Sequence, residues 1–87
     1  MADPWFIYIL ECADSSLYVG STIDVTRRVE EHNSSPKGAA YTKARRPVVL
    51  KYTESHATRS DALKRECEIK SWKRADKLKL ITDHYEV

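Results

Sequence analysis

Five side chains in this chain of 87 residues are of the types that could together cleave a phosphodiester bond. They are two phenols in short aromatic runs, followed by a guanidinium, an imidazole and a carboxylate: Tyr8, Tyr18, Arg28, His32 and Glu66. A guanidinium matches the geometry of phosphate oxygens and can stabilise charge that develops on phosphorus. A carboxylate is a hard-oxygen ligand that suits Mg²⁺ beside phosphate. The set predicts a one-metal site that acts on phosphate esters.

Glu66 is the most informative of the five, because helical spacing places it beside apolar residues. Ala62 and Leu63 precede it by four and three residues, and Ile69 follows it by three, so it would face the core of the protein. An ionised carboxylate against a core costs on the order of several kcal/mol unless a cation or a donor meets it. Two interpretations stay open. Glu66 could bond to Arg28 or a tyrosine hydroxyl, or it could hold a divalent cation.

Arg28 and His32 are four residues apart, which predicts that they lie on one side of a helix, at the rim of the stripe that residues 25 and 29 form. Arg28 could bind phosphate, or it could be a surface arginine beside Glu31 or Asp24. His32 could position a water or a tyrosine hydroxyl, or it could cap the end of the helix.

The two tyrosines lie on predicted neighbouring strands. A phenol has a pKa near ~10 and is a poor base at neutral pH, although a nearby metal or guanidinium would lower that pKa. The alternative for each tyrosine is core packing with a hydrogen-bonded hydroxyl. Gly20 shares a strand face with Tyr18 and would leave room for a ligand or another backbone.

The elements that must position these residues follow from hydrophobic patterning and turn residues. Strands are expected over residues 5–10, 17–20 and 48–52, and residues 38–47 are expected to form a polar, basic loop. Helices are expected from an N-cap at Asp24 to about residue 33, from Thr58 or Ser60 to about residue 72, and over residues 76–83. We therefore predict one α/β (α+β) domain over residues 1–87, in the order β-β-α-β-α-α. Its three-stranded, mainly antiparallel sheet would be flanked by about three helices.

Composition limits the classes of partner. The net charge is only +2, but residues 33–53 carry five basic and no acidic residues, and residues 64–79 carry seven basic against three acidic ones. Clustered bases among aromatics favour a polyanion, although two solvated basic faces would explain them equally well. No apolar run is long enough for a membrane span, and the first residues do not resemble a signal peptide. Cys12 and Cys67 match no metal spacing, so we expect reduced thiols in a cytoplasmic protein.

Several short motifs in their order along the chain resemble the GIY-YIG nuclease domain. They are Phe6-Ile7-Tyr8, Tyr18-Val19-Gly20, Ser21-Thr22, Arg28, His32-Asn33, Gly38 to Thr42, Arg45 to Val48, and Glu66 with the residues up to Lys70. The resemblance covers nearly the whole chain and is greatest to small stand-alone bacterial members related to the Slx-type structure-specific nucleases. It implies a three-stranded antiparallel sheet flanked by helices. It also implies hydrolysis of a DNA strand with one divalent cation, Mg²⁺ or Mn²⁺, in repair or recombination.

The resemblance also implies a role for each site residue. Glu66 would hold the metal, Arg28 would stabilise the phosphorane, and His32 would assist by hydrogen bonding. Tyr8 and Tyr18 would position or deprotonate the attacking water, with the choice between them open. Two departures from the family are Phe6 in place of its first glycine and the absence of an asparagine after Glu66.

Family nucleases usually carry a separate DNA-targeting domain or bind a targeting partner. Here either a protein partner or the chain's own basic residues would bind branched or single-stranded DNA: Lys43, Arg45, Arg46, Lys70, Lys73, Arg74 and Lys77. Two other functions stay open. One is a nucleic-acid-binding module without catalysis, and the other is a protein-interaction domain.

Overall fold

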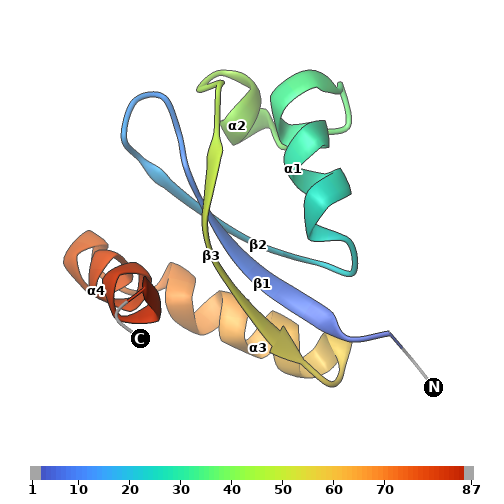
Figure 1. Ribbon diagram of the computed structural model, residues 1–87, viewed down its shortest axis with the longest axis vertical. Coiled ribbons are helices and arrows are strands. Elements are labelled where there is room, and N and C mark those ends of the chain that lie inside the picture. The colour runs from blue at the N-terminus through green and yellow to red at the C-terminus, as the bar shows by residue number, and fades with distance from the viewer. Residues whose placement is uncertain (1–2, 86–87) are drawn as a thin grey trace.

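The sequence folds into a three-stranded sheet with helices on both faces (Figure 1). The computed structural model describes residues 3–85, with side chains up to residue 83. The elements are β1 Trp5–Glu11, β2 Leu17–Thr22, α1 Val25–Ser34, α2 Ala40–Lys43, β3 Val49–His56, α3 Arg59–Lys70 and α4 Arg74–Tyr85. The sheet order is β2-β1-β3, and both pairings are antiparallel. The predicted fold class and order of elements are confirmed.

The central strand β1 divides the molecule into two layers, because successive side chains of a strand point to opposite faces. Ile7 and Ile9 are fully buried in the core that α3 completes with Ala62 and Ile69, and α4 packs on it with Leu80 and Ile81. Tyr8 and Leu10 belong to the second core, on which α1 packs with Val29. Figure 1 shows the same division, with α1 and α2 on one face of the sheet and α3 and α4 on the other.

Both predicted helix starts are capped as expected. The side chain of Asp24 accepts a hydrogen bond from the backbone N–H of Arg27, and Thr58 accepts one from the N–H of Asp61. These caps satisfy donors that the first turn of a helix leaves without a partner. Of the two predicted starts for α3, the structure selects Thr58.

Two predicted boundaries are wrong for a tertiary reason. Strand β3 continues to His56 rather than ending at Tyr52, since its polar half pairs with Trp5 to Tyr8 of β1. The predicted loop over residues 38–47 contains the single turn α2, which Thr42 connects to the rest of the molecule.

Within the described residues no helix is both long and apolar enough to cross a membrane. Cys12 and Cys67 are both free thiols.

Candidate functional site

Tyr8 reaches the helical layer through space that a glycine leaves open. Tyr8 on β1 pairs with Gly20 on β2, and only 1% of Tyr8 is exposed. A Cβ atom at position 20 would lie 2.4 Å from the Tyr8 hydroxyl oxygen. The predicted close approach at Gly20 is therefore made by the Tyr8 ring, and it brings the hydroxyl beneath α1.

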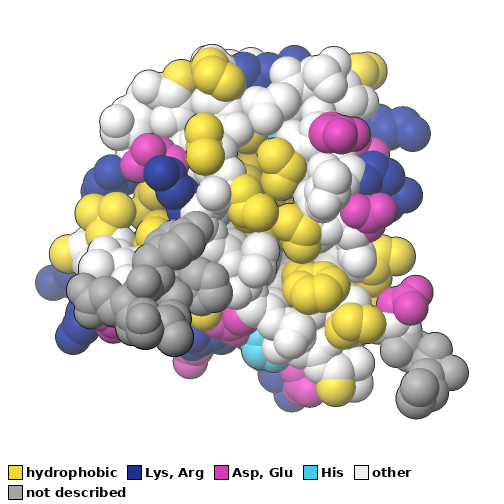
Figure 2. Space-filling view, viewed as in Figure 1, with side chains coloured by type: hydrophobic (Ala, Val, Ile, Leu, Met, Phe, Trp, Pro, Cys, Tyr) yellow, Lys and Arg dark blue, Asp and Glu magenta, His cyan; other side chains and the backbone are white. Residues whose placement is uncertain are grey.

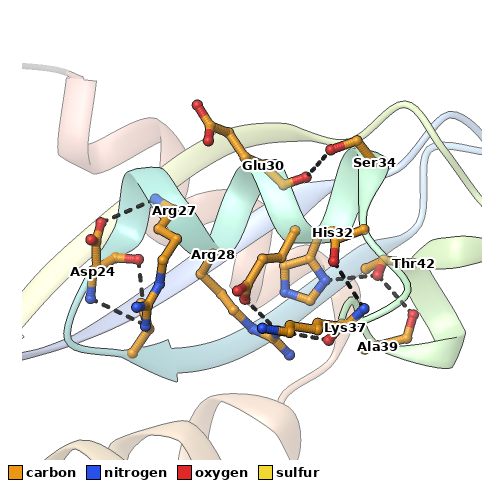
Figure 3. Close-up of polar contacts among 12 residues, drawn as sticks. Asp24, Arg27, Arg28, Glu30, His32, Ser34, Lys37, Ala39 and Thr42 are labelled. Carbon is orange, nitrogen blue, oxygen red and sulfur yellow. Dashed lines mark hydrogen bonds and ion pairs between the residues drawn. The ribbon is translucent and has the colours of Figure 1, made fainter.

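His32 is a buried link between the sheet and α2, and not a helix cap or a rim residue as the spacing had suggested. It is fully buried, and its Nε2 atom lies 2.8 Å from the Tyr8 hydroxyl. Its Nδ1 atom lies 2.7 Å from Oγ1 of Thr42 (Figure 3). His32 follows Val29 by three residues and so shares its inward face, where the hydroxyls of Tyr8 and Thr42 satisfy the ring.

The direction of each hydrogen bond follows from the one proton that Thr42 carries. Its hydroxyl donates to the carbonyl oxygen of Ala39 at 2.9 Å, so Oγ1 can only accept from Nδ1–H of His32. Neutral His32 then has its lone pair on Nε2, which accepts from the Tyr8 hydroxyl. The result is a row of aligned hydrogen bonds from Tyr8 through His32 and Thr42 to Ala39.

Burial keeps both titratable members of this row neutral. It raises the pKa of Tyr8 to about 12, and the charge of Tyr18 acts in the same direction. Arg28 lowers the pKa of Tyr8, as expected for a guanidinium, but burial outweighs it. Burial, followed by Arg28, lowers the pKa of His32 to about 4. The imidazole is therefore neutral at pH 7, and its Nε2 atom accepts a hydrogen bond.

Arg28 lies beside this row of hydrogen bonds. It pairs with Glu31, one of the two surface partners that the sequence suggested. Its Nη1 atom donates to Glu31 Oε1 at 3.0 Å and to the carbonyl oxygen of Lys37 at 2.9 Å, and 27% of its side chain is exposed. Asp24, the other predicted neighbour, caps the helix through Arg27 instead. Figure 3 shows Arg28 extending from α1 toward Lys37, below the ring of His32. The guanidinium is close enough to Tyr8 to lower its pKa, and its side chain is partly exposed to an anion from solvent.

Tyr18 extends the site outward as part of an aromatic row. Its ring centroid lies 5.1 Å from that of His32 and 6.3 Å from that of Tyr8. On its other side Tyr41 stacks at 6.0 Å, and the Arg45 guanidinium lies 3.9 Å from the Tyr41 ring centroid. Tyr41 is 39% exposed, so an aromatic surface continues from the site to solvent.

Glu66 lies at the margin of the core rather than within it. Of its side chain 17% is exposed, and Leu63, expected on the same apolar face, is 42% exposed. The partners of Glu66 are neither Arg28 nor a tyrosine. Ser21 Oγ donates to Oε1 at 2.7 Å, and Lys70 Nζ lies 2.6 Å from Oε2. The apolar stripe of α3 is narrower than predicted, which leaves Glu66 at its edge beside β2.

The residues around His32 and the residues around Glu66 meet at β2, an outer strand of the sheet. Alternation along β2 directs Tyr18 to the face that α1 covers and Ser21 to the face of α3. The charge of Glu66 also raises the pKa of Tyr8, as the smallest of several contributions. Tyr18 in turn raises the pKa of Lys70, although by less than Glu66 does. The five predicted site residues therefore gather around β2, with Tyr8, Tyr18, Arg28 and His32 on the face that α1 covers and Glu66 on the face of α3.

The predicted DNA-contacting residues differ in their surroundings. Arg46 donates to the backbone oxygens of Glu31, His32 and Ser35, and so ties the end of α1 to the following loop. Arg45 pairs with Asp14 at 3.0 Å, and Lys70 is held by Glu66. Of the other four, Lys77 is half-buried and three are exposed: Lys43, Lys73 and Arg74. On the face that Figure 2 shows, hydrophobic side chains gather centrally and Lys and Arg lie around the rim.

A divalent cation would find a single carboxylate here. Within residues 3–83, no three His, Cys, Asp or Glu side chains gather into a metal-binding group. Glu66 nevertheless fits such an ion, since it already binds one cation, the ammonium of Lys70, and offers oxygen donors. Water and phosphate oxygens would have to complete the coordination.

The sequence interpretation missed the roles of three residues. Thr42 orients His32, Ser21 holds Glu66, and Tyr41 extends the aromatic row. Thr42 and Ser21 lie inside motifs that resemble the family, which was the one available signal. Their partners are 10 and 45 residues away, beyond any local pattern.

Comparison with known proteins finds relatives in both sequence and fold. The family model of the GIY-YIG catalytic domain matches residues 4–79. A UPF0213 protein of Staphylococcus aureus is 54% identical over 81 residues, which cover 93% of this chain and 98% of the relative. The solution structure of a UPF0213 protein from Bacillus halodurans is similar with a TM-score of 0.58 at 40% identity, covering 91% of this chain and 83% of that one. A solution structure of a protein from E. faecalis has a TM-score of 0.64 at 38% identity, covering 99% and 92%.

Proposed function

This chain belongs to the GIY-YIG family, and from that premise we propose that it is a DNA endonuclease that uses one divalent cation, Mg²⁺ or Mn²⁺. The family consists of nucleases that generally use a divalent metal. The observation that carries the proposal is the hydrogen bond from the Tyr8 hydroxyl to the neutral Nε2 atom of His32, beside Arg28. A tyrosine packed in a core needs only a hydrogen-bond partner of some kind. The partner of Tyr8 is the lone pair of a neutral imidazole, and Thr42 fixes the orientation of that ring.

The row of hydrogen bonds supplies a route for the proton of the attacking water. The Tyr8 oxygen accepts a proton from water while its own proton passes to His32 Nε2, so no free phenolate forms. The water oxygen bonds to phosphorus, and the bond from phosphorus to the leaving oxygen breaks. That oxygen takes a proton from solvent.

Two charged residues would act on the phosphate itself. Arg28 would oppose the negative charge that builds on the phosphate oxygens. A divalent cation held by Glu66 would add positive charge beside the same phosphate. Glu66 and Arg28 thus have separate roles, and their replacement should have separate effects.

Incubation of labelled branched and single-stranded DNA with Mg²⁺ or Mn²⁺ tests the proposal. The wild type should cleave, and Glu66→Gln should not. Glu68→Gln is the matched control, since Glu68 lies on the same helix, is 56% exposed and pairs with Arg65. Cleavage that persists unchanged in Glu66→Gln would refute the metal role.

The finer parts of the proposal concern substrate and place. We infer that the substrate is branched or single-stranded DNA in repair or recombination, met in the cytoplasm by one domain over residues 1–87. The exposed residues Lys43, Lys73 and Arg74, or a protein partner, would bring the DNA to the site. Binding through phosphates would weaken steeply with salt and would not depend on base sequence.

The Lys70–Glu66 pair favours a second candidate, a nucleic-acid-binding module without catalysis. An ammonium 2.6 Å from Oε2 already neutralises the carboxylate that would hold the metal. DNA binding that depends on salt, with no cleavage under any divalent cation, would establish this candidate and exclude the first.

A further inference from the structure

Glu66 meets the rest of the protein through two donors of different kinds. Oε1 accepts from the neutral hydroxyl of Ser21, while Oε2 faces the charged ammonium of Lys70 at 2.6 Å. Of the Lys70 side chain 52% is exposed, whereas 17% of Glu66 is. The carboxylate is therefore held in place, but the cation on it is only loosely confined.

An ammonium and a divalent metal ion cannot share Oε2. Mg²⁺ binds carboxylate oxygens at about 2.0–2.1 Å and requires near-octahedral geometry around itself. A metal ion at that position would be in direct contact with the ammonium of Lys70, and like charges so close repel strongly. A metal ion on Glu66 must therefore displace Lys70.

We propose that Lys70 is a built-in competitor for the cation position of Glu66 and so determines how tightly the free protein binds a divalent metal. This inference rests on the proposed function, because it takes Glu66 as the metal ligand. Lys70 is then a residue of the site and not one of the outer DNA-contacting bases. Metal binding to the protein alone is weakened, and a bound phosphate group, which offers further oxygen ligands, restores it.

Binding of Mn²⁺ to the protein without DNA tests this inference, with the free ion followed by electron paramagnetic resonance. Lys70→Met removes the charge and keeps most of the stem, so it should bind Mn²⁺ at least about fivefold more tightly, as expected for loss of one partly exposed ion pair. Lys70→Arg keeps a competing cation and should bind like the wild type. Lys73→Met removes an equal charge three residues away and should bind nearly as weakly as the wild type.

Equal Mn²⁺ affinity in Lys70→Met and Lys73→Met would overturn the inference, since the gain would then be general electrostatics. Adding Glu66→Gln to Lys70→Met should abolish the tight binding. Should tight binding survive, the metal sits elsewhere, and both this inference and the metal role of Glu66 fail. The nuclease proposal is judged apart, by DNA cleavage. Lys70→Gln repeats the test should Lys70→Met fold poorly, with circular dichroism as the check.

Discussion

Replacing Thr42 with valine preserves the shape of the side chain and removes the hydroxyl that orients His32. Both residues are fully buried, so water does not take the place of the hydroxyl. Nδ1 of His32 loses its partner at 2.7 Å, and the Ala39 carbonyl loses one of its two donors, the hydroxyl at 2.9 Å, while it keeps the N–H of Lys43. Nδ1 is then a buried polar atom without a partner, with or without its proton, which costs about 1–3 kcal/mol, and a lost hydrogen bond costs about 1 kcal/mol, so the free energy of unfolding should fall by about 2–4 kcal/mol.

Urea unfolding at pH 7 measures this loss, and Thr42→Ser is the control. Serine keeps both hydrogen bonds and loses one buried methyl group, which costs about 1 kcal/mol. The valine variant should therefore be clearly less stable than the serine variant. Equal losses in the two variants would refute the reasoning, because the hydroxyl would then contribute nothing.

Nitrogen chemical shifts of the His32 ring provide a second check. The wild type should carry its proton on Nδ1, and in Thr42→Val the proton should move to Nε2, where the Tyr8 oxygen is the acceptor that remains. A wild-type ring protonated on Nε2 would contradict the direction of the whole row, from Tyr8 to Ala39.

Three further predictions follow from the same contacts. Gly20→Ala should lower the free energy of unfolding by about 1–3 kcal/mol in urea melts, since the new Cβ would lie 2.4 Å from the Tyr8 hydroxyl oxygen, whereas Ala57→Gly in an exposed bend should change it little. The pKa of His32 falls to about 4 on folding, so its contribution to stability is complete above about pH 6.5 and is lost as the pH falls toward 4. Urea melts from pH 7 to 4 should show the free energy of unfolding decreasing over this range, and His32→Gln should make that decrease smaller. Arg46→Ala should cost about 1–3 kcal/mol by removing hydrogen bonds to three backbone oxygens, and an equal effect of Lys43→Ala would count against it.

The parts of the fold that could be predicted are those that local chemistry determines. The apolar run of β1 and the cap at Asp24 each act over a few residues, and both are where the sequence placed them. The end of β3 could not be predicted, since its last residues are polar and extend only because β1 offers them a partner. Arg65 of α3 likewise pairs with Glu54 of β3 as well as with Glu68, and the pair with Glu54 is beyond any helical spacing.

The candidate site shows the same limit more sharply. The types of its residues could be read from the sequence, but their partners could not. His32 counts as polar in any helical pattern, and its burial depends on the hydroxyls of Tyr8 and Thr42, which come from other elements. Glu66 pairs with Lys70, which is only four residues away in the sequence. Its expected buried position predicted partners from other elements instead.

The position of the site around β2 has a consequence for the newly made chain. Its key contacts join residues far apart in sequence, 24 residues for Tyr8 with His32 and 45 residues for Ser21 with Glu66. Contacts of such separation form only once the loops between them have closed. A chain still on the ribosome carries both tyrosines long before Glu66 exists, and a half-folded chain has one side of β2 without the other. Completion of the site thus coincides with completion of the fold.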